Sequence, residues 1–147
     1  MISSFNTSGV SGKELLRIPL EPGRNTWYGS DYTWQISPEG SQIALVKTYG
    51  NQIRLAPLDG RPERIIAVRG HTDLIDMSWA ADSRSLYVSS LEPGGAELLQ
   101  VDLNGDAHPL WLQPQGIWIW GLASPDARHL AISTETPESN VWMISNF

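Results

Sequence analysis

The chain has 147 residues, which is enough for one domain with its own core and too few for two comfortable ones. Ten Lys and Arg residues stand against sixteen Asp and Glu residues, so the net charge is −6 and the sequence predicts no nucleic-acid partner. There is no cysteine, which excludes a disulfide frame and a thiolate nucleophile.

No segment approaches the roughly 20 consecutive apolar residues of a membrane helix, and the N-terminus lacks the pattern of a signal peptide. As written, the sequence predicts a cytoplasmic chain without a membrane segment. The compartment stays open, because a longer chain could carry this segment outside the cytoplasm. Seven Trp, thirteen Gly and ten Pro residues favour short strands separated by turns, and hence an all-β fold.

In chain order, the first short apolar segments lie within residues 2–29 and predict an incomplete unit. Two complete units of four strands are expected at 32–68 and 74–113. A last unit of three strands is expected at 117–147. No stretch of helical periodicity interrupts this order.

The units repeat. The segment "ISPEGSQIALV" at 36–46 returns as "WAADSRSLYVS" at 79–89 and as "ASPDARHLAIS" at 123–133, spaced 43 and 44 residues apart. In the first and third copies Pro occupies the second position of a four-residue turn, which predicts a tight type I turn. The apolar residues that follow alternate with a period of two, which predicts a strand whose two faces meet different layers. Four strands in about 44 residues are typical of a β-propeller blade.

These segments resemble the WD-like repeat of the TolB-type β-propeller family, and the resemblance covers about residues 12–147. The segment "SPDARHLAISTETPESNVWMISNF" resembles the closing blade of bacterial propeller modules fused to winged-helix regulators or Ser/Thr kinases. The resemblance implies an antiparallel propeller and a scaffold or sensor role. The second copy departs from the pattern, since Ala80-Ala81-Asp82-Ser83 replaces Ser-Pro-Asp-Gly and predicts a degraded turn.

About three blades and a partial one cannot close a ring, because propellers have roughly four to eight blades. Either the chain is a piece of a longer propeller or two copies complete one another. We expect a homodimer, since an open half-ring exposes apolar faces and strand edges. The final strand is the expected closure element, through Val141, Trp142, Met143 and Ile144.

The sequence contains no Gly-x-Ser-x-Gly elbow, no His-Glu-x-x-His and no phosphate-binding Gly-rich loop, so we expect no enzyme and no cofactor. His71, with Asp73 and Asp76 nearby, permits a metal or acid–base cluster. We favour a loop-capping histidine that bonds to the backbone, and we predict no metal site.

Trp118 and Trp120 share one strand face and could stack on a sugar or a peptide. We favour the alternative that they fill the space between blades, and expect the same of Trp34 and Trp79.

In propellers the loops between the last strand of one blade and the first strand of the next surround one mouth of the central channel, where ligands bind. The resemblance therefore implies a ligand site of polar and aromatic residues in those loops. The predicted function is non-catalytic binding of a protein or peptide, with a self-assembling structural unit and a carbohydrate-binding lectin as alternatives. The candidate residues are Tyr28, Asp31, Tyr32, Arg69, His71, Asp73, Gln115 and Trp118.

Overall fold

The computed structural model describes residues 2–4, 13–16, 18 and 31–137. These residues form strands and turns and no helix, which confirms the all-β prediction. Among the same residues there is no helix that could span a membrane. Tyr28 and the expected closure residues Val141, Trp142, Met143 and Ile144 lie outside the described part of the chain.

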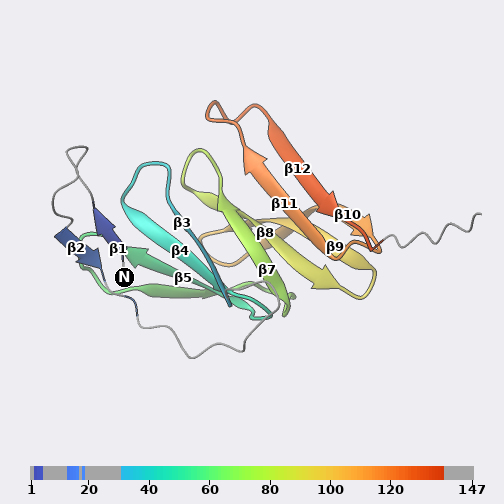
Figure 1. The fold of residues 1–147 in the computed structure, drawn as a ribbon, viewed down its shortest axis with the longest axis horizontal. Coiled ribbons are helices and arrows are strands. Elements are labelled where there is room, and N and C mark those ends of the chain that lie inside the picture. Colours follow the sequence, from blue (N-terminus) through green and yellow to red (C-terminus); the bar gives the residue numbers. More distant parts are fainter. Residues whose placement is uncertain (1, 5–12, 17, 19–30, 138–147) are drawn as a thin grey trace, which may run out of the picture.

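The strands form antiparallel sheets whose neighbours follow chain order (Figure 1). Two of the sheets have four strands each and two have two strands. The first pair is β1 (Ile2–Ser4) and β2 (Lys13–Leu16). The first four-stranded sheet contains β3 (Tyr32–Ile36), β4 (Gln42–Lys47), β5 (Gln52–Pro57) and β6 (Arg64–Ala67). The second contains β7 (Leu74–Trp79), β8 (Ser85–Glu92), β9 (Gly95–Asp102) and β10 (Ala107–Pro114), and the last pair is β11 (Trp118–Ala123) and β12 (Leu130–Glu135).

The turn between the first and second strands has the same geometry in three sheets. The backbone N–H of the fourth residue donates to the carbonyl of the first, with Gly40 donating to Ser37 at 2.8 Å. Ser83 donates to Ala80 at 3.0 Å and Ala127 to Ser124 at 2.9 Å. The fourth residue has a positive φ in every copy, near 60° even in the two that are not glycine. The second copy was expected to be degraded, and that expectation is wrong, because the backbone hydrogen bond forms without the proline.

Alternation along the strands divides the core into layers. On β4, Ala44 and Val46 pack in the cluster between the two four-stranded sheets, whereas Ile43 and Leu45 pack with Ala56 on the opposite face. On β8 the residues Leu86 and Val88 enter the same central cluster. The prediction that each face of these strands meets a different layer is therefore confirmed.

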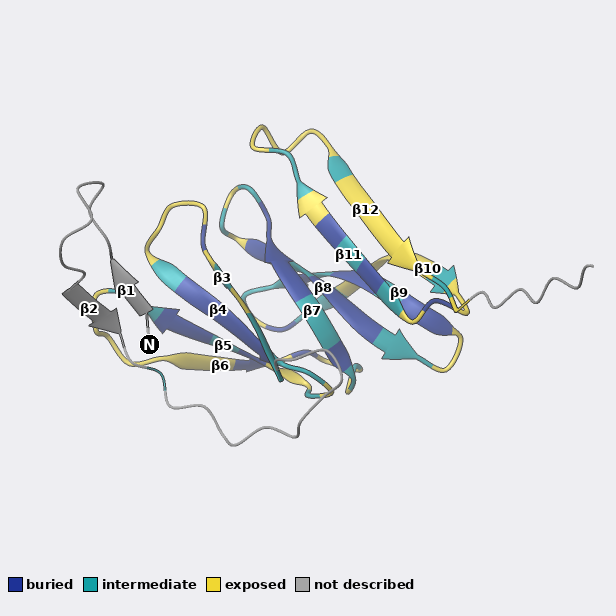
Figure 2. Cartoon of the chain, viewed as in Figure 1, coloured by how far each residue is buried: buried dark blue, intermediate teal, exposed yellow. Residues whose placement is uncertain are grey.

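Figure 2 shows the resulting pattern of burial, with β4, β8 and β9 mostly buried, β5 half buried, and β6, β10 and β12 mostly exposed. Trp79 is buried as predicted, with 4% of its surface exposed. Trp34 was expected in the core as well, but it is 57% exposed. Trp79 packs in the cluster between the two four-stranded sheets, whereas Trp34 pairs with Leu45 and therefore lies on the opposite face of its sheet.

Specific hydrogen bonds connect each sheet to the next. The indole Nε1 of Trp79 donates to the carbonyl of Gln35 at 3.1 Å, and the backbone N–H of Trp79 donates to the Gln35 side-chain oxygen at 2.7 Å. The hydroxyls of Ser78 and Ser89 donate to the carbonyls of Gly121 and Ile119 on β11. Because Trp79, Ser78 and Ser89 are buried, these bonds hold β3, β7 and β11 in a fixed relation.

Candidate functional site

A pocket of about 670 Å³ lies where the first strands of three sheets begin. Each of β3, β7 and β11 supplies two consecutive residues at its N-terminal end or just before it. The remaining wall comes from the far ends of β8 and β12 and from the turn that follows β4. The lining residues are Tyr32, Thr33, Thr48, Tyr49, Ile75, Asp76, Leu91, Ile117, Trp118 and Glu135.

Antiparallel pairing explains why these segments meet. The start of a first strand lies opposite the end of the second strand, as in the pairs of Tyr32 with Lys47 and of Trp118 with Glu135. The turn after β4 is also fixed to the next sheet, because the N–H of Tyr49 donates to the carbonyl of Leu74 at 2.8 Å. Backbone hydrogen bonds within each sheet and between neighbouring sheets therefore hold the segments that line the pocket.

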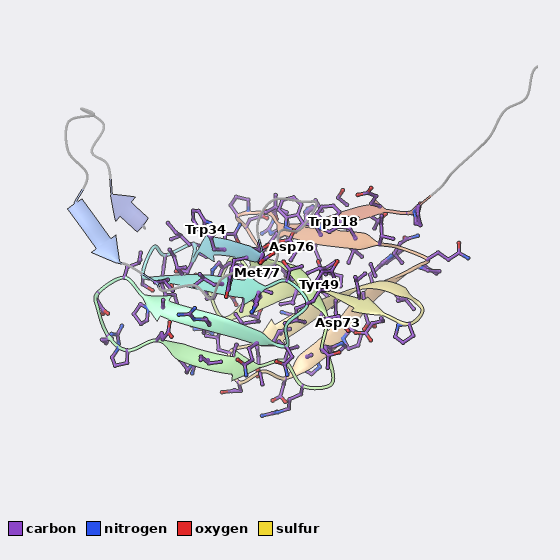
Figure 3. All side chains as sticks on the ribbon, turned by 60° about the horizontal axis from the view of Figure 1, so that its bottom comes forward. Trp34, Tyr49, Asp73, Asp76, Met77 and Trp118 are labelled. Atoms are coloured by element: carbon purple, nitrogen blue, oxygen red, sulfur yellow. The ribbon has the colours of Figure 1, made fainter. Side chains whose placement is uncertain are left out.

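A β-bulge at the start of β7 directs Asp76 toward the pocket. Leu74 pairs with Ser90 and Asp76 pairs with Ser89, so Ile75 is the extra residue on β7. Bulges bend a strand and change the direction of its side chains, which is why they recur beside binding sites. Figure 3 shows Asp76 in the same region as Tyr49 and Trp118, which come from different sheets.

The environment of Asp76 opposes ionisation. Burial raises the pKa of this carboxyl above its usual value, although hydrogen bonds from the backbone of Met77 and from the side chains of Trp118 and Thr33 act in the other direction. The bond from the Met77 N–H is 2.7 Å long. A carboxylate that is partly withdrawn from water and faces a cavity is a favourable site for a cationic or hydrogen-bond-donating group.

The pocket lining combines acidic and aromatic groups. Asp76 and Glu135 supply two carboxylates, and Tyr32, Tyr49 and Trp118 supply three aromatic rings. Trp118 stacks on Trp120, with ring centroids 6.5 Å apart and an interplanar angle of 20°. Such a combination suits a positively charged group, which gains from both the carboxylates and the aromatic faces.

The predicted site residues fall into two groups. Tyr32 and Trp118 line the pocket. Arg69 instead forms an ion pair with Asp106, and Gln115 is exposed in the turn before β11, where its N–H donates to the Gly94 carbonyl at 3.1 Å. Asp73 lies beside the pocket without lining it, since its carbonyl accepts the N–H of the lining residue Leu91.

Sequence reasoning missed most of the pocket. Thr33, Tyr49 and Glu135 were not considered, and Asp76 was considered only as a companion of His71. The missing signal was strand register, because the end of each second strand must lie beside the start of the first strand. A search of the turns after β4, β8 and β12 would have included Tyr49.

Asp31 precedes β3 and has both carboxylate oxygens buried. Among the described residues neither oxygen has a hydrogen-bond partner. A buried carboxylate without a partner costs free energy, so the described contacts give the Asp31 side chain no compensating hydrogen bond.

His71 forms neither of the arrangements considered from the sequence. Its Nδ1 lies 2.7 Å from Oε1 of Glu92 and 3.9 Å from Oε2 of Glu97, whereas Asp73 and Asp76 are not in this group. In place of the expected bond to the loop backbone, the His71 side chain contacts the side chains of Glu92 on β8 and Glu97 on β9. Burial alone would raise the pKa of Glu92, but the hydrogen bonds from His71 and Ser90 and the charge of His71 lower it.

Comparison with known proteins adds little to this description. No family model matches the chain, and no curated protein matches it. Among solved structures, the chain is similar to a Bacteroides fragilis protein described as a candidate 6-phosphogluconolactonase, with 20% identity and a TM-score of 0.46. The similarity covers 67% of this chain and 30% of that protein, so the chain spans less than a third of its length. A likeness of this extent identifies neither a family nor an activity.

Proposed function

We propose that the chain is a non-catalytic binding module of the β-propeller type, whose pocket receives a positively charged group of a peptide or protein partner. The observation that carries the proposal is the meeting of two carboxylates and three aromatic rings in one pocket of about 670 Å³. The net charge of −6 supports it, because an acidic surface attracts a basic partner over distances beyond direct contact.

The pocket residues are suited to binding rather than to a chemical step. Asp76 is engaged by hydrogen bonds from Met77, Thr33 and Trp118, which fix its orientation. The nearby hydroxyls of Ser78 and Ser89 each donate to a backbone carbonyl of β11, so their protons are already used. A preorganised carboxylate between aromatic rings holds a cation without further reorganisation.

The test is a set of short peptides with blocked ends that differ only at a central Lys, Arg, Glu or Leu, measured by isothermal titration calorimetry. The Lys and Arg peptides should bind, and Asp76→Asn should weaken them roughly 10- to 100-fold, the loss of about 1.5–3 kcal/mol expected for a charged hydrogen bond. Trp111→Ala is the matched control, because Trp111 is 52% exposed on β10 and is not a lining residue.

Peptides that bind regardless of the central charge would overturn this assignment. The lectin alternative makes a different prediction, since a glycan should then quench the fluorescence of Trp118 while the Lys and Arg peptides do not bind. The aromatic pair of Trp118 and Trp120 is the observation that favours this second candidate.

The proposal includes the propeller arrangement itself, with each four-stranded sheet as one blade. It is supported by the contact of β7 with both β3 and β11, which places the first strands of successive sheets side by side. It is also supported by the equivalent turns that begin at Ser37, Ala80 and Ser124, at spacings that match the sequence repeat. The TolB-type resemblance implies the same arrangement.

Self-association is the other part of the proposal. On β3 and β7 the face toward the next sheet is covered by that sheet, through the side chains of Gln35 and Ser78. On β11 the corresponding face carries Trp120 and Leu122, and Leu122 is 42% exposed. The occupant that fits is a sheet of the same kind, and we assign it to a second copy of the chain.

Light scattering should give a mass twice the 16.3 kDa of one chain. Leu122→Glu should convert the dimer to a monomer, whereas Leu112→Glu on β10, at a residue that is 46% exposed, should not. A wild-type monomer, or equal effects of the two substitutions, would contradict a second copy at this face.

A further inference from the structure

We infer that His71, Glu92 and Glu97 form a binding site for a divalent transition metal, with zinc as the best match. The three side chains come from separate segments: the loop between β6 and β7, the end of β8, and β9. Their ligand atoms all lie within 4.8 Å of one another. This site is distinct from the pocket, so the inference does not depend on the proposed function.

Cross-strand register brings the two glutamates together. Ser90 pairs directly with Glu97, and Glu92 is two residues further along β8, so the two carboxylates are diagonal neighbours on one sheet face. Like charges at such positions repel each other, and a metal cation bound between them would offset that repulsion. Their side chains are largely shielded, with exposed fractions of 27% for Glu92 and 17% for Glu97.

Hydrogen bonding from His71 satisfies only one of the two carboxylates. A single Nδ1–H can serve Glu92 at 2.7 Å, while Glu97 at 3.9 Å is beyond hydrogen-bond range. Glu92 also accepts the Ser90 hydroxyl at 2.9 Å. Within the described part of the chain the Glu97 carboxylate receives no hydrogen bond, although it lies 3.9 Å from the His71 imidazole.

The distances suit a zinc ion with small adjustments. Zinc at about 2.1 Å from each ligand in tetrahedral geometry requires ligand atoms roughly 3.4 Å apart. The two observed separations from His71 Nδ1, 2.7 and 3.9 Å, lie on either side of that value. Changes of this size are within the reach of side-chain torsions in Glu92 and Glu97.

The ligand types select the metal. Imidazole nitrogen with carboxylate oxygen suits zinc and similar transition metals, whereas Mg²⁺ and Ca²⁺ prefer sites built from oxygen alone. Three protein ligands leave a fourth position for water or for an anionic group. A bound ion would also fix the loop between β6 and β7 to the end of β8, where Leu91 forms part of the pocket wall.

The test is calorimetric titration of the full chain with Zn²⁺ alone. We expect saturation at one equivalent, and a higher unfolding temperature in the presence of Zn²⁺ because the ion binds only the folded site. Glu97→Gln should lower the affinity by at least about tenfold, since losing even an outer-shell partner of a metal ligand costs 10- to 100-fold.

His129→Asn is the matched control, because His129 is an exposed histidine outside the cluster. It should leave the titration unchanged, and the circular dichroism of metal-free Glu97→Gln should match that of the wild type. Three results would overturn the inference: the absence of saturable Zn²⁺ binding, equal weakening by Glu97→Gln and His129→Asn, or displacement of Zn²⁺ by equimolar Ca²⁺.

Discussion

Replacing Gly105 by alanine should destabilise the protein far more than the same change at Gly60. Both glycines occupy the turn after the third strand of a sheet, and both have left-handed backbone, with φ of +88° and +84°. Alanine in that conformation costs about 1–2 kcal/mol at either position. The positions differ in what a methyl group would meet.

At Gly60 an added Cβ has nothing within 4 Å, whereas at Gly105 it would lie 2.1 Å from the carbonyl oxygen of Ala67 on the neighbouring sheet. Contacts of a real Cβ are essentially never shorter than 3.0 Å, so the two sheets must separate locally. That movement also strains the bond from the Arg69 N–H to the Gly105 carbonyl, 3.1 Å long. Overpacking of this kind adds about 1–3 kcal/mol.

We therefore expect Gly60→Ala to lower the free energy of unfolding by about 1–2 kcal/mol and Gly105→Ala by about 2–5 kcal/mol. Urea unfolding followed by tryptophan fluorescence measures both, and the midpoint of Gly105→Ala should be the lower by roughly 1 M. Equal losses in the two variants would refute the reasoning, because the approach to Ala67 would then carry no energetic weight.

Three further outcomes are expected. Trp79→Ala should cost about 3–5 kcal/mol of unfolding free energy in urea titrations, against less than about 1 kcal/mol for Trp111→Ala, since the exposed fractions of the two residues are 4% and 52%. Asp76→Asn should raise the free energy of unfolding at pH 7 but not at pH 3. Because burial raises the pKa of Asp76, the contribution of this carboxyl to stability is present at pH values below about 3.9 and is lost as the pH rises through the folded-state pKa. A benefit of Asp76→Asn that is the same at both pH values would contradict this assignment. Asp31→Asn should raise the melting temperature in differential scanning calorimetry, because it removes a charge from buried oxygens that have no partner among the described residues, and a lower melting temperature would show that the charge is used.

Some residues of the candidate site could be found from the sequence, and others could be assigned only from the structure. Tyr32 and Trp118 were found from the sequence because they begin first strands, whose positions follow from the repeat. Asp76 was not assigned to a pocket, because its direction depends on the bulge at Ile75, and the sequence gives no sign of an extra residue there. His71 was placed with the wrong carboxylates, since its partners Glu92 and Glu97 are 21 and 26 residues away along the chain and were not near it in the sequence.

The sequence by itself determined the all-β class, the positions of the turns and the alternation of the second strands, as at Ala44 and Leu45. These features depend on local physics, namely the φ preferences of turn residues and the period of two in an extended chain. The tertiary structure alone decided that Trp79 is buried while Trp34 is exposed, and that Asp76 faces a pocket. Those outcomes depend on which sheet covers which face, and that is set by packing between residues far apart in the sequence.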